Sequence, residues 1–216
     1  MVRRSIRATD EERQRTLPGD ELILKPTASL TQAITLRCTA DRIWPWLAQM
    51  GAGRAGWYSY DAIDNGGKPS AERIVPELQV VEVGFLFPWL PHAVEGFVVL
   101  ACEEERFLVL GAPAPDGHAI VTWSFVLEPR TDGTTRLIVR SRANAAYGFA
   151  RLPPWVVKRL LPPGHFVMQR RQLLGIARRA EQSAATVSAT PSSAMHSSAA
   201  STLPRVLSEA RYHHRW

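Results

Sequence analysis

Residues 120–142 read IVTWSFVLEPRTDGTTRLIVRSR, and this stretch decides the fold. Large apolar side chains fall on every second residue from Trp123 to Leu127, and the second half of the stretch alternates in the same way. Alternation with a period of two is typical of strands that bury one face. Asp-Gly at 132–133 favours a tight hairpin turn. The stretch therefore predicts two antiparallel strands, 120–128 and 135–142.

Shorter strand patterns precede this hairpin. Residues 32–38 alternate between apolar and polar side chains, and the apolar runs 78–83, 97–102 and 106–110 are separated by turn-forming or acidic residues. Strands at such short spacing indicate antiparallel pairing rather than βαβ units. We expect one curved antiparallel sheet.

Helical patterns occur after the first strand and near the end of the chain. Apolar residues from Ile43 to Met50 recur at helical spacing, and Thr39 stands where a capping residue is expected. A second short helix is predicted over 57–65. A third, over 155–161, precedes a long final helix over 165–181. The pattern predicts an α+β protein with one antiparallel sheet and a long C-terminal helix.

Composition divides the 216 residues into three parts. We expect an N-terminal arm at 1–27, a folded domain at 28–181 and a disordered tail at 182–216. Ser, Ala and Thr make up sixteen of the residues 182–202. Such a segment buries too little apolar surface to offset the entropy of ordering it.

The net charge of +6 is unevenly distributed. Residues 151–181 carry seven basic side chains and one Glu, whereas residues 21–150 carry eleven basic and fourteen acidic ones. A nucleic-acid-binding sheet has the opposite bias, so no nucleic-acid partner is expected. The basic last helix leaves open an interaction module for an acidic partner.

Two cysteines, Cys38 and Cys102, are too few for a disulfide framework, which favours a reducing cytoplasmic location. No apolar stretch follows Met1–Ser5, so we expect no secretory signal. The apolar window 80–102 is interrupted by charges and prolines, so no transmembrane segment is expected.

Motifs for cofactors and catalysis are weak. Residues 51–56, GAGRAG, match the dinucleotide fingerprint but follow a predicted helix rather than a strand, so we interpret them as a turn. The six histidines show no metal-ligand spacing, and no G-x-S-x-G elbow occurs. We expect no metal and no cofactor, and the sequence identifies no catalytic residue.

Aromatic residues are the most informative feature for function. Trp and Tyr have polar tips that need partners, and they often line cavities with one wet end. Arg140 on a strand could bind a ligand carboxylate, although the alternation equally allows it to face outward. The predicted ligand-binding residues are Trp57, Tyr60, Trp123, Arg140, His165 and Met168.

Four segments carry a family resemblance: IWPWLAQMG at 43–51, GWYSYD at 56–61, RIVPELQ at 73–79 and HFVM at 165–168. Together with the order of elements, they resemble the START-like, polyketide-cyclase/dehydrase and lipid-transport (SRPBCC) superfamily. They are most similar to an uncharacterised bacterial branch of it. The resemblance covers residues 28–181.

The resemblance implies a helix-grip fold with a tunnel between the sheet and the last helix. Members bind lipids, sterols, polyketides, plant hormones or aromatic compounds, and some catalyse cyclisation or dehydration. In this branch acidic residues often flank the HFVM segment, but here Pro162-Pro163-Gly164 and Gln169 stand at those positions. That departure favours binding over catalysis.

Three functions remain open at this point. The first is the binding or carrying of a small hydrophobic molecule in an internal cavity. The second is a polyketide cyclase, aromatase or dehydratase that uses the same cavity, with His165 as the acid or base because imidazole titrates near neutral pH. The third is the interaction module formed by the basic helix.

Overall fold

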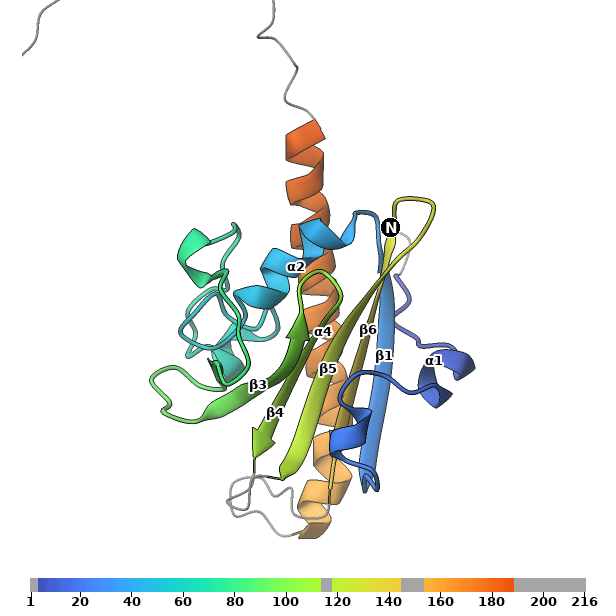
Figure 1. Cartoon of the computed structure of the whole chain (residues 1–216). Coiled ribbons are helices and arrows are strands. Elements are labelled where there is room, and N and C mark those ends of the chain that lie inside the picture. Colours follow the sequence, from blue (N-terminus) through green and yellow to red (C-terminus); the bar gives the residue numbers. More distant parts are fainter. Residues whose placement is uncertain (1–3, 114–117, 145–153, 189–216) are drawn as a thin grey trace, which may run out of the picture.

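The computed structural model describes residues 4–113, 118–144 and 154–188. Six strands form one antiparallel sheet in the order β1-β6-β5-β4-β3-β2 (Figure 1). The strands are β1 (Ala28–Leu36), β2 (Leu86–Pro88), β3 (Gly96–Glu103), β4 (Phe107–Pro113), β5 (Ala119–Pro129) and β6 (Thr135–Ala143). The helices are α1 (Asp10–Gln14), η1 (Asp20–Leu22), α2 (Ala40–Ala48), α3 (Asp61–Asp64), η2 (Pro76–Leu78) and α4 (Pro154–Ser188).

The deciding hairpin forms as predicted, since β5 and β6 pair antiparallel from Val121–Ala143 to Pro129–Thr135. The strand predicted over 78–83 is wrong. Pro76 begins the 3-10 helix η2 there, and Val80 and Val83 are each 67% exposed. In a strand, residues 80 and 83 would point to opposite faces, so one of them would be buried. Both are exposed, so this segment has no buried strand face.

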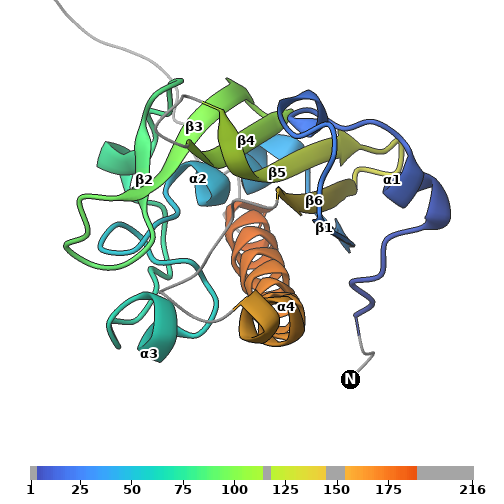
Figure 2. The ribbon, with the colours of Figure 1, turned by 90° about the horizontal axis from the view of Figure 1, so that it is seen from below.

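The concave face of the sheet carries the main core. Phe125 and Leu127 on β5 and Leu137 and Val139 on β6 are buried there, as the alternation predicts. α4 lies across this face and contacts α2 and β1 (Figure 2). Leu173, Ile176, Ala177 and Ala180 form the buried stripe of α4.

Two helix predictions need correction near the first strand. Thr39 is the N-cap of α2, but its side chain makes no capping hydrogen bond. The helix predicted over 57–65 is reduced to α3 because Tyr58 has a positive φ of 59°, a left-handed conformation that helices exclude.

The last helix is longer than predicted. α4 is continuous through Pro162-Pro163-Gly164, so the two helices predicted on either side of that segment are one. It also continues beyond residue 181 to Ser188, and the hydroxyl of Ser183 donates to the carbonyl of Arg179, which satisfies a carbonyl in that last part. Residues 182–188, which the sequence analysis assigns to the tail, belong to α4, and 189–216 lie outside the described residues.

The N-terminal arm is part of the fold. Thr9 and Glu12 form a reciprocal capping box at α1, which fixes the direction of the chain. Ala8 and Leu17 then pack on Val126 and Ile138, on the convex face of the sheet. Both faces of the central strands are thus covered, by α4 on one side and by the arm on the other (Figure 2).

The glycine-rich segment 51–56 is a turn, as interpreted from the sequence. Gly51 and Gly56 form an antiparallel bridge, and the side chain of Arg54 folds into the turn, where its guanidinium donates to the carbonyls of Met50, Ala48 and Leu78. The same guanidinium lies 4.7 Å from the ring centre of Phe85. Burial lowers the pKa of Arg54. The side chain of Arg54, which belongs to the glycine-rich motif, therefore occupies the inside of the turn.

Cys38 and Cys102 are free thiols, and burial raises the pKa of Cys38 to about 11. In the part of the chain that the structure describes, no helix combines the length and apolarity needed to cross a bilayer.

Candidate functional site

Aromatic rings gather where the concave face meets the segment after the glycine-rich turn. The rings of Trp57 and Trp123 stack with centroids 5.5 Å apart, and Phe97 meets both of them edge-on. Phe87 and Phe125 complete this aromatic cluster. β5 positions Trp123 in register with Leu110 of β4 and Ser141 of β6, so the cluster extends from the centre of the sheet toward β2.

His165 joins the aromatic cluster to α4. Its ring lies edge-on to Trp123, with centroids 5.7 Å apart, and its Nε2 lies 2.9 Å from the hydroxyl oxygen of Ser141. Burial lowers the pKa of His165, which leaves a neutral imidazole at pH 7. A neutral imidazole paired with a hydroxyl can accept or donate one proton, as its tautomer dictates.

Two buried polar atoms beside His165 have no hydrogen-bond partner among the described residues. One is the indole Nε1–H of Trp123, a donor, and the other is the amide Oε1 of Gln169, an acceptor. Gln169 lies one helical turn after His165. Its side chain raises the pKa of His165, which opposes the effect of burial. The amide oxygen of Gln169 nevertheless does not reach hydrogen-bond geometry with any group among the described residues. Buried polar groups are nearly always paired, so each of these atoms needs an explanation.

Three of the predicted site residues are brought together, namely Trp57, Trp123 and His165. Met168 follows His165 on α4, and its carbonyl accepts a hydrogen bond from the hydroxyl of Ser59. Tyr60 is 39% exposed, and its ring lies under the guanidinium of Arg171, away from the cluster.

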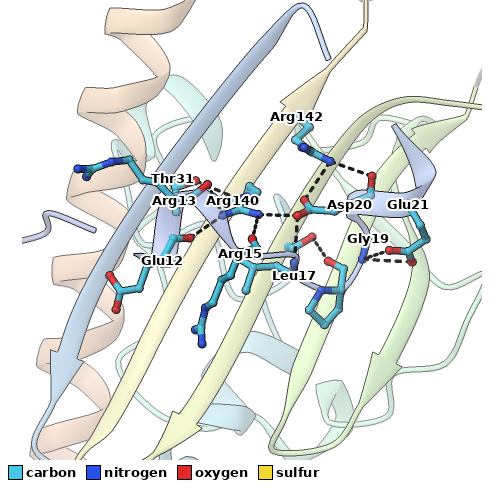
Figure 3. Close-up of polar contacts among 12 residues, drawn as sticks. Glu12, Arg13, Arg15, Leu17, Gly19, Asp20, Glu21, Thr31, Arg140 and Arg142 are labelled. Atoms are coloured by element: carbon cyan, nitrogen blue, oxygen red, sulfur yellow. Dashed lines mark hydrogen bonds and ion pairs between the residues drawn. The ribbon is translucent and has the colours of Figure 1, made fainter. Parts of the chain in front are cut away.

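Arg140 lies on the opposite face of the sheet from the aromatic cluster. Its guanidinium is buried beneath the arm, where it pairs with Asp20 and donates to Thr31 and to the carbonyls of Glu12, Arg13 and Arg15 (Figure 3). The strand alternation explains the placement, because Arg140 follows inward-facing Val139 by one residue. Its role in this structure is to fasten the arm.

Sequence reasoning missed Ser141, Gln169 and Phe97. Ser141 lies on the inward phase of β6, and Gln169 lies four residues after His165, so periodicity could have indicated both once His165 was chosen. Phe97 carried no such signal, because its contact with Trp57 joins two segments that are distant in sequence.

Comparisons with known proteins address the fold. No family model matches the chain, and no curated protein matches it. Among solved structures, protein NE0264 from Nitrosomonas europaea is 16% identical with a TM-score of 0.46, and the match covers 73% of this chain and 96% of that one. The Polyketide_cyc-like protein Cgl2372 from Corynebacterium glutamicum is 15% identical with a TM-score of 0.34, over 78% of this chain and 97% of that one.

The fold is a helix grip. The strand order and the position of α4 across the concave face establish this, as the four sequence motifs predicted.

Within residues 4–113, 118–144 and 154–188, no three His, Cys, Asp or Glu side chains gather as a group that could hold an ion.

Proposed function

We propose that the protein binds a small, mostly apolar molecule that carries a hydroxyl group, between the concave face of the sheet and α4. The observation that carries the proposal is the pair of partnerless atoms beside His165, the indole N–H of Trp123 and the amide oxygen of Gln169. One lacks an acceptor and the other a donor. A single hydroxyl supplies both, because it has one O–H and two lone pairs.

The surroundings of these atoms favour an apolar body for the ligand. Half-buried Phe97 and Trp123 offer flat apolar surface, and buried Trp57 packs behind them. The guanidinium of Arg54 lies 5.0 Å from the ring centre of Phe87. Aromatic surface with a few well-placed polar groups is typical of small-molecule sites. Enclosing about 300 Å² of apolar ligand surface contributes roughly 7 kcal/mol before the costs of association.

Binding of 2-naphthol, an aromatic bicycle with one hydroxyl, tests this proposal by titration calorimetry. Gln169→Leu removes the acceptor and keeps similar volume, so we expect it to weaken binding about tenfold, the equivalent of one hydrogen bond. Trp44→Phe is the matched control, because Trp44 is buried in α2 outside the aromatic cluster. It should leave the affinity within about twofold of the wild-type value.

Two outcomes contradict the proposal. One is equal weakening by Gln169→Leu and Trp44→Phe. The other is absence of heat with 2-naphthol, together with native mass spectra that show no small molecule retained from the expression host.

A second candidate function, proton transfer on a bound carbonyl compound, is favoured by the contact between His165 and Ser141. The lowered pKa of His165 provides a neutral base at pH 7. This candidate predicts protein-dependent hydrogen–deuterium exchange at the methyl group of acetophenone, which His165→Gln abolishes. Exchange at the rate of buffer alone would leave binding as the function.

A further inference from the structure

A groove of about 750 Å³ opens between the arm, β1 and α4. Ile6 and Arg7 of the arm form one wall, Phe166 and Arg170 of α4 form the other, and Gln32 of β1 lies between them. The arm is held there by an antiparallel bridge between Arg7 and Gln32, and Figure 2 shows the start of the arm beside β1. We call this feature the edge groove.

The edge groove is lined by four arginines and by no acidic residue. Arg4 pairs with Glu181, and Arg13 pairs with Asp10. Arg7 and Arg170 have no ion-pair partner among the residues that the structure describes, and they come from opposite walls. Two unneutralised guanidinium groups that face one groove form a site for an anion, because guanidinium binds carboxylate and phosphate oxygens in a fork geometry.

A second, independent observation at the edge groove concerns Gln32. Its side chain is 2% exposed, and its amide Oε1 has no hydrogen-bond partner within the described part of the chain. The amide nitrogen is already used, since it donates to the carbonyl of Phe166 at 3.5 Å. A buried amide oxygen without a donor is costly, so this position favours a ligand group that carries a proton.

The apolar part of the edge groove comes from the wall of α4. Phe166 is 42% exposed and lines the groove one helical turn before Arg170. A large exposed aromatic beside unpaired cations fits an amphiphile rather than a fully polar anion.

We propose that the edge groove binds an anionic amphiphile, a phosphate monoester on a hydrocarbon chain. The unprotonated oxygens of the monoanion match Arg7 and Arg170, its one remaining P–OH provides a donor for Gln32, and the chain lies against Phe166. This site uses none of the residues of the aromatic cluster, so its test is independent of the test of the function proposed above.

Octyl phosphate is the probe, and its affinity is measured by titration calorimetry at low salt. We expect the double variant Arg7→Gln/Arg170→Gln to bind at least tenfold more weakly than the wild type, and Gln32→Leu to bind three- to tenfold more weakly. The matched control is Arg106→Gln/Arg130→Gln, which removes the same charge from two exposed positions outside the groove. It should change the affinity by less than threefold, because distant surface charges are screened.

Further probes define the ligand class and its source. Octanol and inorganic phosphate should each bind at least tenfold more weakly than octyl phosphate, since each lacks one half of the amphiphile. Vesicles of phosphatidylcholine with phosphatidic acid, compared with phosphatidylcholine alone, distinguish a membrane headgroup from a free molecule. Binding to the former that Arg7→Gln/Arg170→Gln abolishes indicates the headgroup, and octyl phosphate binding without vesicle binding indicates the free molecule.

The proposal is overturned if the two double variants bind octyl phosphate equally, or if inorganic phosphate binds as tightly as octyl phosphate. Circular dichroism at the working temperature verifies that each variant is folded. If Gln32→Leu is unfolded, the two double variants still decide the result, because their four arginines are exposed.

Discussion

The guanidinium of Arg140 and the carboxylate of Asp20 form a buried ion pair that joins β6 to the N-terminal arm (Figure 3). Their side chains are 3% and 9% exposed. The same carboxylate accepts a hydrogen bond from the backbone N–H of Leu17, so it also shapes the arm. The ion pair joins residues that are 120 positions apart in the sequence, and it holds the arm over the convex face of the sheet.

Replacement of Asp20 by Asn should destabilise the protein by about 3 kcal/mol, because it leaves the buried charge of Arg140 without its counter-ion. Urea unfolding at pH 7, followed by circular dichroism, measures the change. The control is Glu128→Gln, which breaks the half-exposed ion pair with Arg15 and should cost no more than about 1 kcal/mol. Equal effects of the two substitutions would show that Asp20 does not fasten the arm.

Gly56 and Gly133 allow steric crowding to be separated from backbone strain, since their φ angles are 79° and 77°. A Cβ on Gly56 would lie 2.2 Å from the Oγ of Ser70, whereas a Cβ on Gly133 would meet nothing within 4 Å. Gly133→Ala should therefore cost about 1 kcal/mol, the strain of a left-handed alanine. Gly56→Ala should cost about 2 to 4 kcal/mol, since it also displaces Ser70. Similar melting temperatures for the two variants would contradict the close approach at Ser70.

The stability of the arm should depend on pH through Glu12. Its hydrogen bond with Arg136 lowers the pKa of Glu12 to about 2, from 4.5. Because the pKa is lower in the folded protein, the stabilisation is fully present above about pH 5 and is lost as the pH falls toward 2. After allowance for solvent screening, the loss amounts to about 1 to 3 kcal/mol. Urea unfolding at pH 6 and pH 3 should show a smaller pH dependence for Glu12→Gln than for the wild type, and parallel curves would refute the assignment.

Sequence alone predicted the sheet well where one face is apolar and the other is not. The hairpin of β5 and β6 follows from alternation and an Asp-Gly turn, both of which are local signals. Val80 and Val83 misled the prediction because their apolar character does not reveal that they are exposed. The continuity of α4 through Pro162 and Pro163 was also missed, since a local rule for proline predicts a break.

The candidate site was predictable only in part. Trp57, Trp123 and His165 were chosen as polar-tipped or titratable residues, and the fold brings them together. Arg140 was chosen for its charge, but the side of the sheet that an arginine faces depends on what covers each face. That residues 4–27 cover one face was not predictable, because the apolar residues of the arm have no regular period.

The arm also constrains the order in which the chain can mature. Glu12 and Asp20 leave the ribosome early, yet their partners Arg136 and Arg140 are synthesised more than a hundred residues later. Until then neither carboxylate has its arginine partner. The two ion pairs that fasten the arm to β6 can therefore form only after the hairpin of β5 and β6 has been synthesised.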